Sequence, residues 1–165
     1  VVNKDLFLLF RCANRLSLNV SKTEFLIFGP PKCSLPERIV LTLNNQKIFE
    51  SYKMKYLGLI LDTRLTFKDH IDELSKKLSQ SIGMLYKIRS LSSPPILLSL
   101  YHAIFSSHLT YGLPVWGNTN QKNRKRIELL QKKAIRAISN SDYNAHTSPI
   151  FKNLGLLKLK DQYDY

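Results

Sequence analysis

Positively charged side chains are the residues whose type and spacing point most directly to chemistry. Between Gly117 and Asn140 the chain carries seven basic residues and one acidic residue, Glu128, which leaves a local net charge of +6. The basic residues are Lys122, Arg124, Lys125, Arg126, Lys132, Lys133 and Arg136. A row of cations with so few acids is typical of a surface that follows a phosphate backbone with salt-sensitive and largely sequence-independent affinity.

The helical period divides this segment into two sides. At about 100° per residue, Lys125, Lys132 and Arg136 fall within a narrow arc, away from the apolar stripe that begins at Ile127. A solvated face of an ordinary soluble helix has the same charge pattern, so charge alone leaves both interpretations open. A helix lying on a membrane surface is disfavoured because the apolar side is rich in alanine and has no aromatic residue.

The remaining polar residues form no recognisable catalytic set. Asp69 and Glu73 stand four residues apart, and they fit complementation of a helix dipole better than catalysis. The four histidines lack zinc-like spacing and the two cysteines, Cys12 and Cys33, are far apart, so the sequence predicts no metal site. The six glycines include no loop that could cradle a phosphate. The sequence by itself offers no catalytic centre.

Whole-chain composition favours a polyanionic partner. Among 165 residues, 25 Lys plus Arg against 12 Asp plus Glu leave a net charge of +13. Apolar residues make up 44% and charged residues 22%, which is typical of a protein that buries a core. No apolar run approaches the roughly 18 residues of a membrane span, and there is no secretory leader pattern. The first methionine is Met54, which predicts that the chain is part of a longer product.

The order of the helices and strands expected from the sequence predicts an α+β fold. A short helix and a small antiparallel sheet are followed by a mostly helical bundle of three helices. Hydrophobic periodicity and turn residues place the boundaries. Helices are expected over 3–14, 66–89, 95–109 and 120–139, strands over 24–28, 39–43, 48–49 and 55–61, loops over 30–37 and 111–117, and a short helix or strand over 151–159.

Two features of the bundle carry definite expectations about packing. One apolar stripe at helical spacing should face the core: Ile71, Leu74, Leu78, Ile82 and Leu85. The single tryptophan, Trp116, could stack on a base or sugar. A lone tryptophan between Pro114 and Gly117 more often anchors a loop onto a helical core, and that is the interpretation we prefer.

Three segments, in this order and at this spacing, resemble the reverse transcriptases of non-LTR retrotransposons. They are 16–28 (Leu-Ser-Leu-Asn, then Lys-Thr and an apolar strand), 55–71 (Lys-Tyr-Leu-Gly-Leu-Ile-Leu-Asp, then Leu-Thr-Phe and His-Ile) and 114–149 (Pro-Val-Trp-Gly, then Leu-Gln-Lys-Lys-Ala-Ile-Arg and Ala-His-Thr-Ser-Pro). The third segment is most similar to the jockey and CR1-like branches. The resemblance runs from about 15 to 159, which is most of the chain.

The resemblance implies a right-hand polymerase that copies RNA into DNA by target-primed reverse transcription. The chain would supply the end of the palm (1–62), a helical thumb-like region (63–141) and the start of a connector (142–165). The carboxylates that hold Mg²⁺ in this family would lie upstream of Val1, so the chain alone would be inactive and would hold the primer–template duplex. Mg²⁺ is expected for the full-length polymerase and no cofactor for this chain.

The implied partners are an RNA template with a DNA primer and the fingers and palm of the same polymerase. No membrane and no small-molecule cofactor are expected. Because the reaction ends on chromosomal DNA, the resemblance places the protein in the nucleus and cytoplasm. It also leaves an alternative open: a domesticated or decayed remnant that serves as a helical protein- or nucleic-acid-binding module with no catalysis.

Four further residues take candidate roles from the resemblance. Lys22 matches a lysine near the phosphates of the incoming nucleotide, where it could donate a proton to pyrophosphate. Because the carboxylates of the metal site would lie outside this chain, we prefer the interpretation of Lys22 as a surface lysine at a turn. Tyr56, Leu57 and Gly58 match the primer-grip strand, where a glycine lets the primer backbone come close. A plain buried strand with a bulge is the competing explanation.

Overall fold

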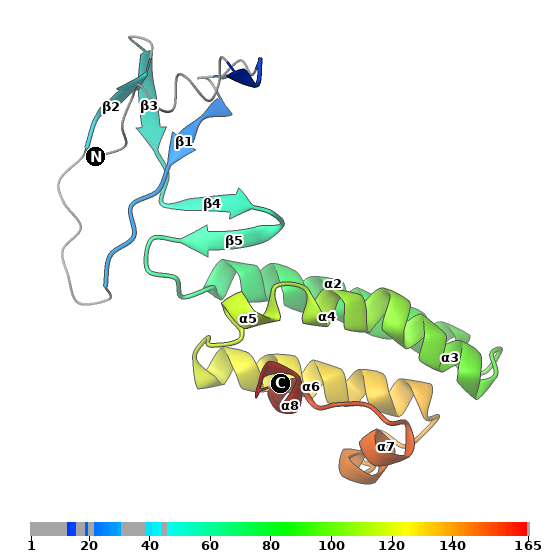
Figure 1. Cartoon of the computed structure of the whole chain (residues 1–165). Helices are drawn as coiled ribbons and strands as arrows, with labels where there is room; N and C mark the ends of the chain where they lie inside the picture. Colours follow the sequence, from blue (N-terminus) through cyan, green and yellow to red (C-terminus); the bar gives the residue numbers. More distant parts are fainter. Residues whose placement is uncertain (1–12, 16–18, 20–21, 31–38, 44–45, 165) are drawn as a thin grey trace. The chain divides into compact units, whose positions relative to one another are not determined.

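The fold is α+β, as the sequence predicts. Figure 1 shows the computed structural model, which describes residues 13–15, 19, 22–30, 39–43 and 46–164. The predicted helix over 3–14 and the predicted loop over 30–37 lie almost wholly outside the described residues. The chain divides into two compact units, one of residues 1–54 with 62–64 and one of residues 55–61 with 65–165.

The first unit contains a small sheet in the order β1-β3-β2. Strands β2 (Leu41–Leu43) and β3 (Gln46–Glu50) are antiparallel, with Leu41 opposite Ile48, as the predicted antiparallel sheet requires. Strand β1 (Glu24–Phe25) adds to β3 in parallel, which the sequence did not indicate, and it is shorter than the predicted strand over 24–28. Among the described residues, every buried apolar side chain belongs to the second unit.

Three long helical stretches form the second unit. The first is α2 (Lys68–Ile88) and the last is α6 (Gln121–Ile138), each within two residues of its expected bounds. Between them run α3 (Pro94–Leu100), a π-helical segment (Tyr101–Ser106) and α4 (Ser107–Thr110) without a break. The buried hydroxyl of Ser81 on α2 donates to the Ile104 carbonyl at 2.7 Å, which satisfies an acceptor within the π-helical segment.

The core lies where α2, the central helical stretch and α6 meet. The predicted stripe of α2 is confirmed, because all five of its residues are buried and three of them, Ile71, Leu78 and Leu85, have no exposed surface. Facing side chains come from the other two stretches, including Phe105 and Ile127. Periodicity in the sequence therefore identified the face of α2 that packs inward.

The segment after α4 contains a helical turn where the sequence predicted none. The chain turns at Gly112, with φ of 63°, and then forms α5 (Leu113–Trp116), with Pro114 in its first turn, where a proline is tolerated. Trp116 is fully buried and its indole N–H donates to the Tyr111 carbonyl at 2.9 Å. The preferred interpretation of Trp116 as a core anchor is confirmed.

Two short helices complete the second unit. Helices α7 (Thr147–Asn153) and α8 (Leu159–Asp164) both pack on α6, and Figure 1 shows α8 lying against it. Phe151 and Leu159 are their buried contacts. The carboxy-terminal part of the described chain is therefore held on the same helix that carries the basic residues.

Candidate nucleic-acid interface

The Tyr-Leu-Gly segment forms a hairpin turn. The continuous strand predicted over 55–61 is wrong: β4 (Lys53–Tyr56) and β5 (Leu59–Asp62) are consecutive paired strands. Leu57 and Gly58 both have positive φ, 45° and 79°, which is the conformation of a tight two-residue hairpin turn. Leu57 is 71% exposed rather than buried, so the turn presents an apolar side chain to solvent.

Tyr111 holds this turn in place. Its hydroxyl donates to the Leu57 carbonyl at 2.5 Å, and a Cβ added at Gly58 would lie 3.2 Å from the Tyr111 ring. Glycine at this position thus satisfies both the backbone conformation and the close approach of an aromatic ring. Of the three candidate residues here, Tyr56 and Leu57 are exposed, and Gly58 lines a pocket.

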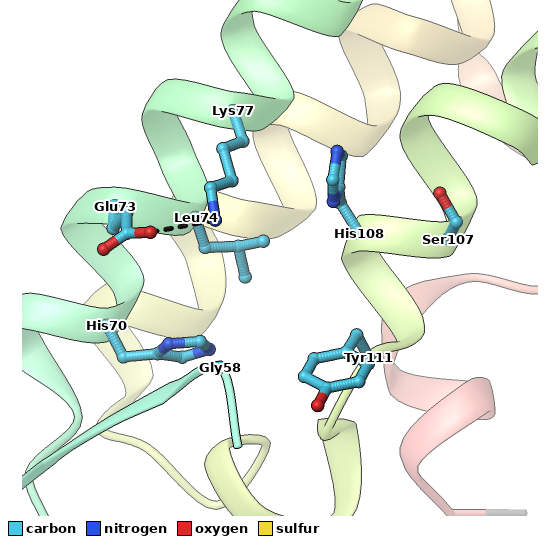
Figure 2. Close-up of a pocket in the computed structure, with 8 residues that line it drawn as sticks. All are labelled: Gly58, His70, Glu73, Leu74, Lys77, Ser107, His108 and Tyr111. Carbon is cyan, nitrogen blue, oxygen red and sulfur yellow. Dashed lines mark ion pairs between the residues drawn. The ribbon is translucent and has the colours of Figure 1, made fainter. Parts of the chain in front are cut away.

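The pocket beside the turn has a volume of about 230 Å³. Figure 2 shows His70, Glu73, Leu74 and Lys77 on one side, from α2, and Ser107, His108 and Tyr111 on the other. The Glu73 carboxylate forms two salt bridges. Its Oε1 lies 2.8 Å from the Lys77 Nζ, drawn as the dashed line in Figure 2, and 3.4 Å from the Lys55 Nζ. These cations neutralise the one carboxylate in the pocket wall.

The electrostatics of this pocket favour a neutral imidazole next to a charged carboxylate. Burial lowers the pKa of His70, whose Nε2 has no hydrogen-bond partner among the described residues. Hydrogen bonds from Lys77 and Lys55 lower the pKa of Glu73 despite a partial opposing effect of burial. Ser107 is engaged as a donor to the Ala103 carbonyl at 2.6 Å, so no activated nucleophile faces the space.

The described residues do not form a magnesium site. No group of three or more His, Cys, Asp or Glu side chains comes together among them in a way that could hold a metal ion. Lys55 and Lys77 occupy the Glu73 carboxylate, which is therefore a poor metal ligand.

The seven predicted cations on α6 have different surroundings. Lys122, Lys125 and Lys133 are exposed. Arg126 forms an ion pair with Asp72 of α2, and the Arg124 guanidinium stacks over the Tyr163 ring at 5.9 Å. These two arginines therefore contribute to packing between elements. The Nε of Arg124 is buried and has no hydrogen-bond partner among the described residues.

Lys132 and Arg136 line an open pocket of about 500 Å³ between α6 and residues 144–160. Lys158 and Lys160 line the same pocket, and sequence reasoning missed both as binding candidates. No signal in the sequence could have found them, because residues 142–165 contain three lysines and three aspartates and are locally neutral. Only the packing of α7 and α8 on α6 brings these lysines to the basic helix.

Lys22, the remaining candidate, lies in the first unit. Its side chain is exposed, and its backbone N–H donates to the Asn19 carbonyl at 3.1 Å, as expected of a residue in a turn. The Thr23 hydroxyl donates to the same carbonyl at 2.8 Å. All the other candidate residues belong to the second unit.

Comparison with known proteins finds relatives among the polymerases of insect mobile elements. The chain is 30% identical over 148 residues to the RNA-directed DNA polymerase from mobile element jockey of Drosophila melanogaster, covering 88% of this chain and 16% of that protein. It is also 30% identical over 111 residues to the probable RNA-directed DNA polymerase from transposon X-element of the same fly, covering 66% of this chain and 12% of that protein. No protein-family model matches the chain, and no solved structure does.

These relatives show the family. The chain belongs to the RNA-directed DNA polymerases of non-LTR mobile elements, as the resemblance in its sequence motifs predicts. It spans less than a fifth of the length of the curated relatives it matches. No helix among the described residues is long and apolar enough to cross a membrane.

Proposed function

We propose that this chain is the part of a mobile-element RNA-directed DNA polymerase that holds the duplex of RNA template and DNA primer. The fingers and the catalytic part of the palm would then be its partners within the same polymerase. The carboxylates and the Mg²⁺ used in nucleotidyl transfer would be supplied by those parts, because the described residues bring no metal ligand set together. The polymerase would act in the nucleus and the cytoplasm.

The exposed cations of α6 are the observation that carries this proposal. Lys122, Lys125 and Lys133 point to solvent, and no ion pair joins them to an acidic residue in the described part of the chain. The only acidic residue on α6 is Glu128. A helix face with this charge attracts a phosphate backbone without reading its sequence, which suits a polymerase that must slide along its substrate.

The hairpin turn would act at the same duplex. The exposed side chains of Tyr56 and Leu57 and the small Gly58 would let the primer backbone come close to the turn. Lys22 would meet the phosphates of the incoming nucleotide once the rest of the polymerase is in place. These roles rest on the family to which the chain belongs, and they are part of the proposal.

The salt dependence of duplex binding tests this proposal. The 165-residue chain should bind a fluorescein-labelled RNA–DNA hybrid at micromolar concentration at physiological salt, measured by fluorescence anisotropy. The triple variant K122Q/K125Q/K133Q should flatten the slope of log K against log salt by about two to three units, because each phosphate contact contributes about 0.9. The matched control K68Q/K76Q/K87Q removes the same charge from exposed positions of α2 and should leave most of the slope.

An equal loss of slope in both triple variants would show that binding follows net charge and that the α6 face has no special role. Absence of any binding by the wild-type chain, with self-association in sedimentation, would instead favour a protein-binding role.

A further inference from the structure

The basic pocket between α6 and residues 144–160 is built from three parts of the chain. Lys132 and Arg136 come from α6, Lys158 precedes α8, and Lys160 lies in its first turn. Glu128 is the only carboxylate that lines the pocket. None of the four cations forms an ion pair with a carboxylate in the described part of the chain. The pocket therefore concentrates positive charge in a concave space.

Backbone and hydroxyl groups orient two of these cations. The Arg136 Nε–H donates to the Ala145 carbonyl at 2.9 Å, which fixes the plane of the guanidinium and leaves its two terminal nitrogens for another acceptor. On the opposite wall the Lys158 ammonium donates to the Ser148 hydroxyl at 3.2 Å. Fixed donors of this kind lose less side-chain entropy on binding an anion than free surface lysines do.

A buried glutamine holds the two walls together. Gln131 is 2% exposed, its Nε2 donates to the Leu157 carbonyl at 3.0 Å, and its Oε1 accepts from the Leu159 backbone N–H at 2.9 Å. The residues on either side of Lys158 are thus tied directly to α6. These two hydrogen bonds of the Gln131 side chain set the spacing between the cations on α6 and the two lysines at 158 and 160.

We propose that this pocket binds backbone phosphates of the nucleic-acid strand that lies on α6. The inference rests on the proposed function and extends it, because it makes Lys158 and Lys160 part of the interface. Phosphodiester oxygens match the oriented guanidinium and the two lysines. A volume of about 500 Å³ accommodates a phosphate with part of its sugar. Four cations and one carboxylate line the pocket, so the lining stays net positive with one phosphodiester bound.

The double variant K158Q/K160Q tests the pocket separately from the exposed face of α6. Both lysines are exposed, so their replacement leaves the core intact. We expect the salt slope of RNA–DNA hybrid binding to fall by about one to two units. The matched control K68Q/K87Q, which removes two charges at opposite ends of α2, should change it by less than about half a unit.

The outcomes separate the two proposals. If K122Q/K125Q, on α6 but outside the pocket, lowers the slope while K158Q/K160Q does not, the pocket proposal is overturned and the proposed function stands. If K158Q/K160Q lowers the slope and K122Q/K125Q does not, the pocket stands and the exposed face of α6 loses its role. If the wild-type chain does not bind the hybrid at all, both fall.

A direct probe identifies the bound group. In ¹H–¹⁵N spectra of the 165-residue chain, the hybrid should shift the amide signals of Ala145 to Ser148, at the mouth of the pocket. A hybrid with uncharged methylphosphonate linkages should not shift them. Inorganic phosphate alone, at the same phosphate concentration, should give much smaller shifts. Equal shifts with inorganic phosphate would overturn the assignment to a strand, because the pocket would then be a site for free phosphate.

Discussion

Two buried polar side chains of the second unit, Gln131 and His70, differ in how fully they are hydrogen-bonded. The side-chain amide nitrogen and oxygen of Gln131 are both hydrogen-bonded to backbone groups, those of Leu157 and Leu159. His70 is 7% exposed, and its Nε2 has no partner among the described residues. Desolvation by burial penalises the charged imidazole more than the nearby Glu73 carboxylate favours it, so the pKa of His70 is lowered.

His70 should make the protein less stable as the pH falls. Its pKa in the folded chain lies below the ordinary value of 6.5, so the unfolded chain binds more protons below that pH. The free energy of unfolding is therefore unaffected by protonation of His70 above about pH 6.5. It decreases as the pH falls from there through the lower pKa of the folded state. Replacing His70 with phenylalanine should remove this decline and reduce by a few degrees the change in Tm between about pH 7.5 and about pH 5.5.

The control is the exposed His102, for which the same replacement should leave the pH dependence of Tm as in the wild type. Calorimetry of the three proteins in matched buffers measures the effect. A His70→Phe variant whose Tm still falls as steeply as that of the wild type would show that other groups cause the acid sensitivity.

At the scale of elements, the hairpin turn between β4 and β5 combines an exposed apolar side chain with a backbone that suits it poorly. Leu57 has φ of 45° and is 71% exposed. A left-handed conformation costs most residues about 1–2 kcal/mol, whereas asparagine adopts it with less penalty. With its side chain in solvent and its backbone in this conformation, a leucine at this position contributes little to the fold.

Replacing Leu57 with asparagine should therefore stabilise the chain and weaken its proposed function. Asn-Gly is a favoured sequence for a two-residue hairpin turn, so we expect the free energy of unfolding to rise by up to about 1 kcal/mol in urea titrations. If the turn touches the duplex, affinity for the RNA–DNA hybrid should fall at the same time. Unchanged affinity in a stabilised variant would remove Leu57 from the interface.

Gly58→Ala is the companion variant, with the opposite effect on stability. Its positive φ and the Tyr111 ring 3.2 Å from an added Cβ should lower the free energy of unfolding by about 1 kcal/mol or more. Comparing the two variants separates strain in the turn from contact with nucleic acid.

The same elements show what the sequence can reveal. The stripe from Ile71 to Leu85 and the anchoring role of Trp116 were predictable because local spacing alone specifies a buried helix face or a loop anchor. The hairpin at Leu57 was not, because an apolar run looks the same whether it continues or turns. The basic face of α6 was read from charge, but its extension by Lys158 and Lys160 depends on Gln131, a contact between residues more than twenty positions apart.

At the scale of the whole molecule, burial is distributed very unevenly. All the buried apolar side chains among the described residues lie from Phe67 onward. The strands of the first unit leave large apolar side chains in solvent, such as Phe49, which is 77% exposed. Local stability depends on buried apolar contacts, so the two units should open with different free energies.

Hydrogen exchange measured by mass spectrometry should show this difference directly. Amides of α2 between Ile71 and Leu85 and of α6 between Ile127 and Ile138 should exchange most slowly, because their helices share the core. Amides of β2 and β3 should exchange much faster, because their ladder covers no buried apolar side chain in the described residues. Adding the RNA–DNA hybrid should slow exchange at the start of α7, beside the basic pocket, while the central turns of α2 stay unchanged. Equal protection of β2, β3 and the core helices in the free chain would contradict this account, since it would mean that the sheet has a buried face of its own.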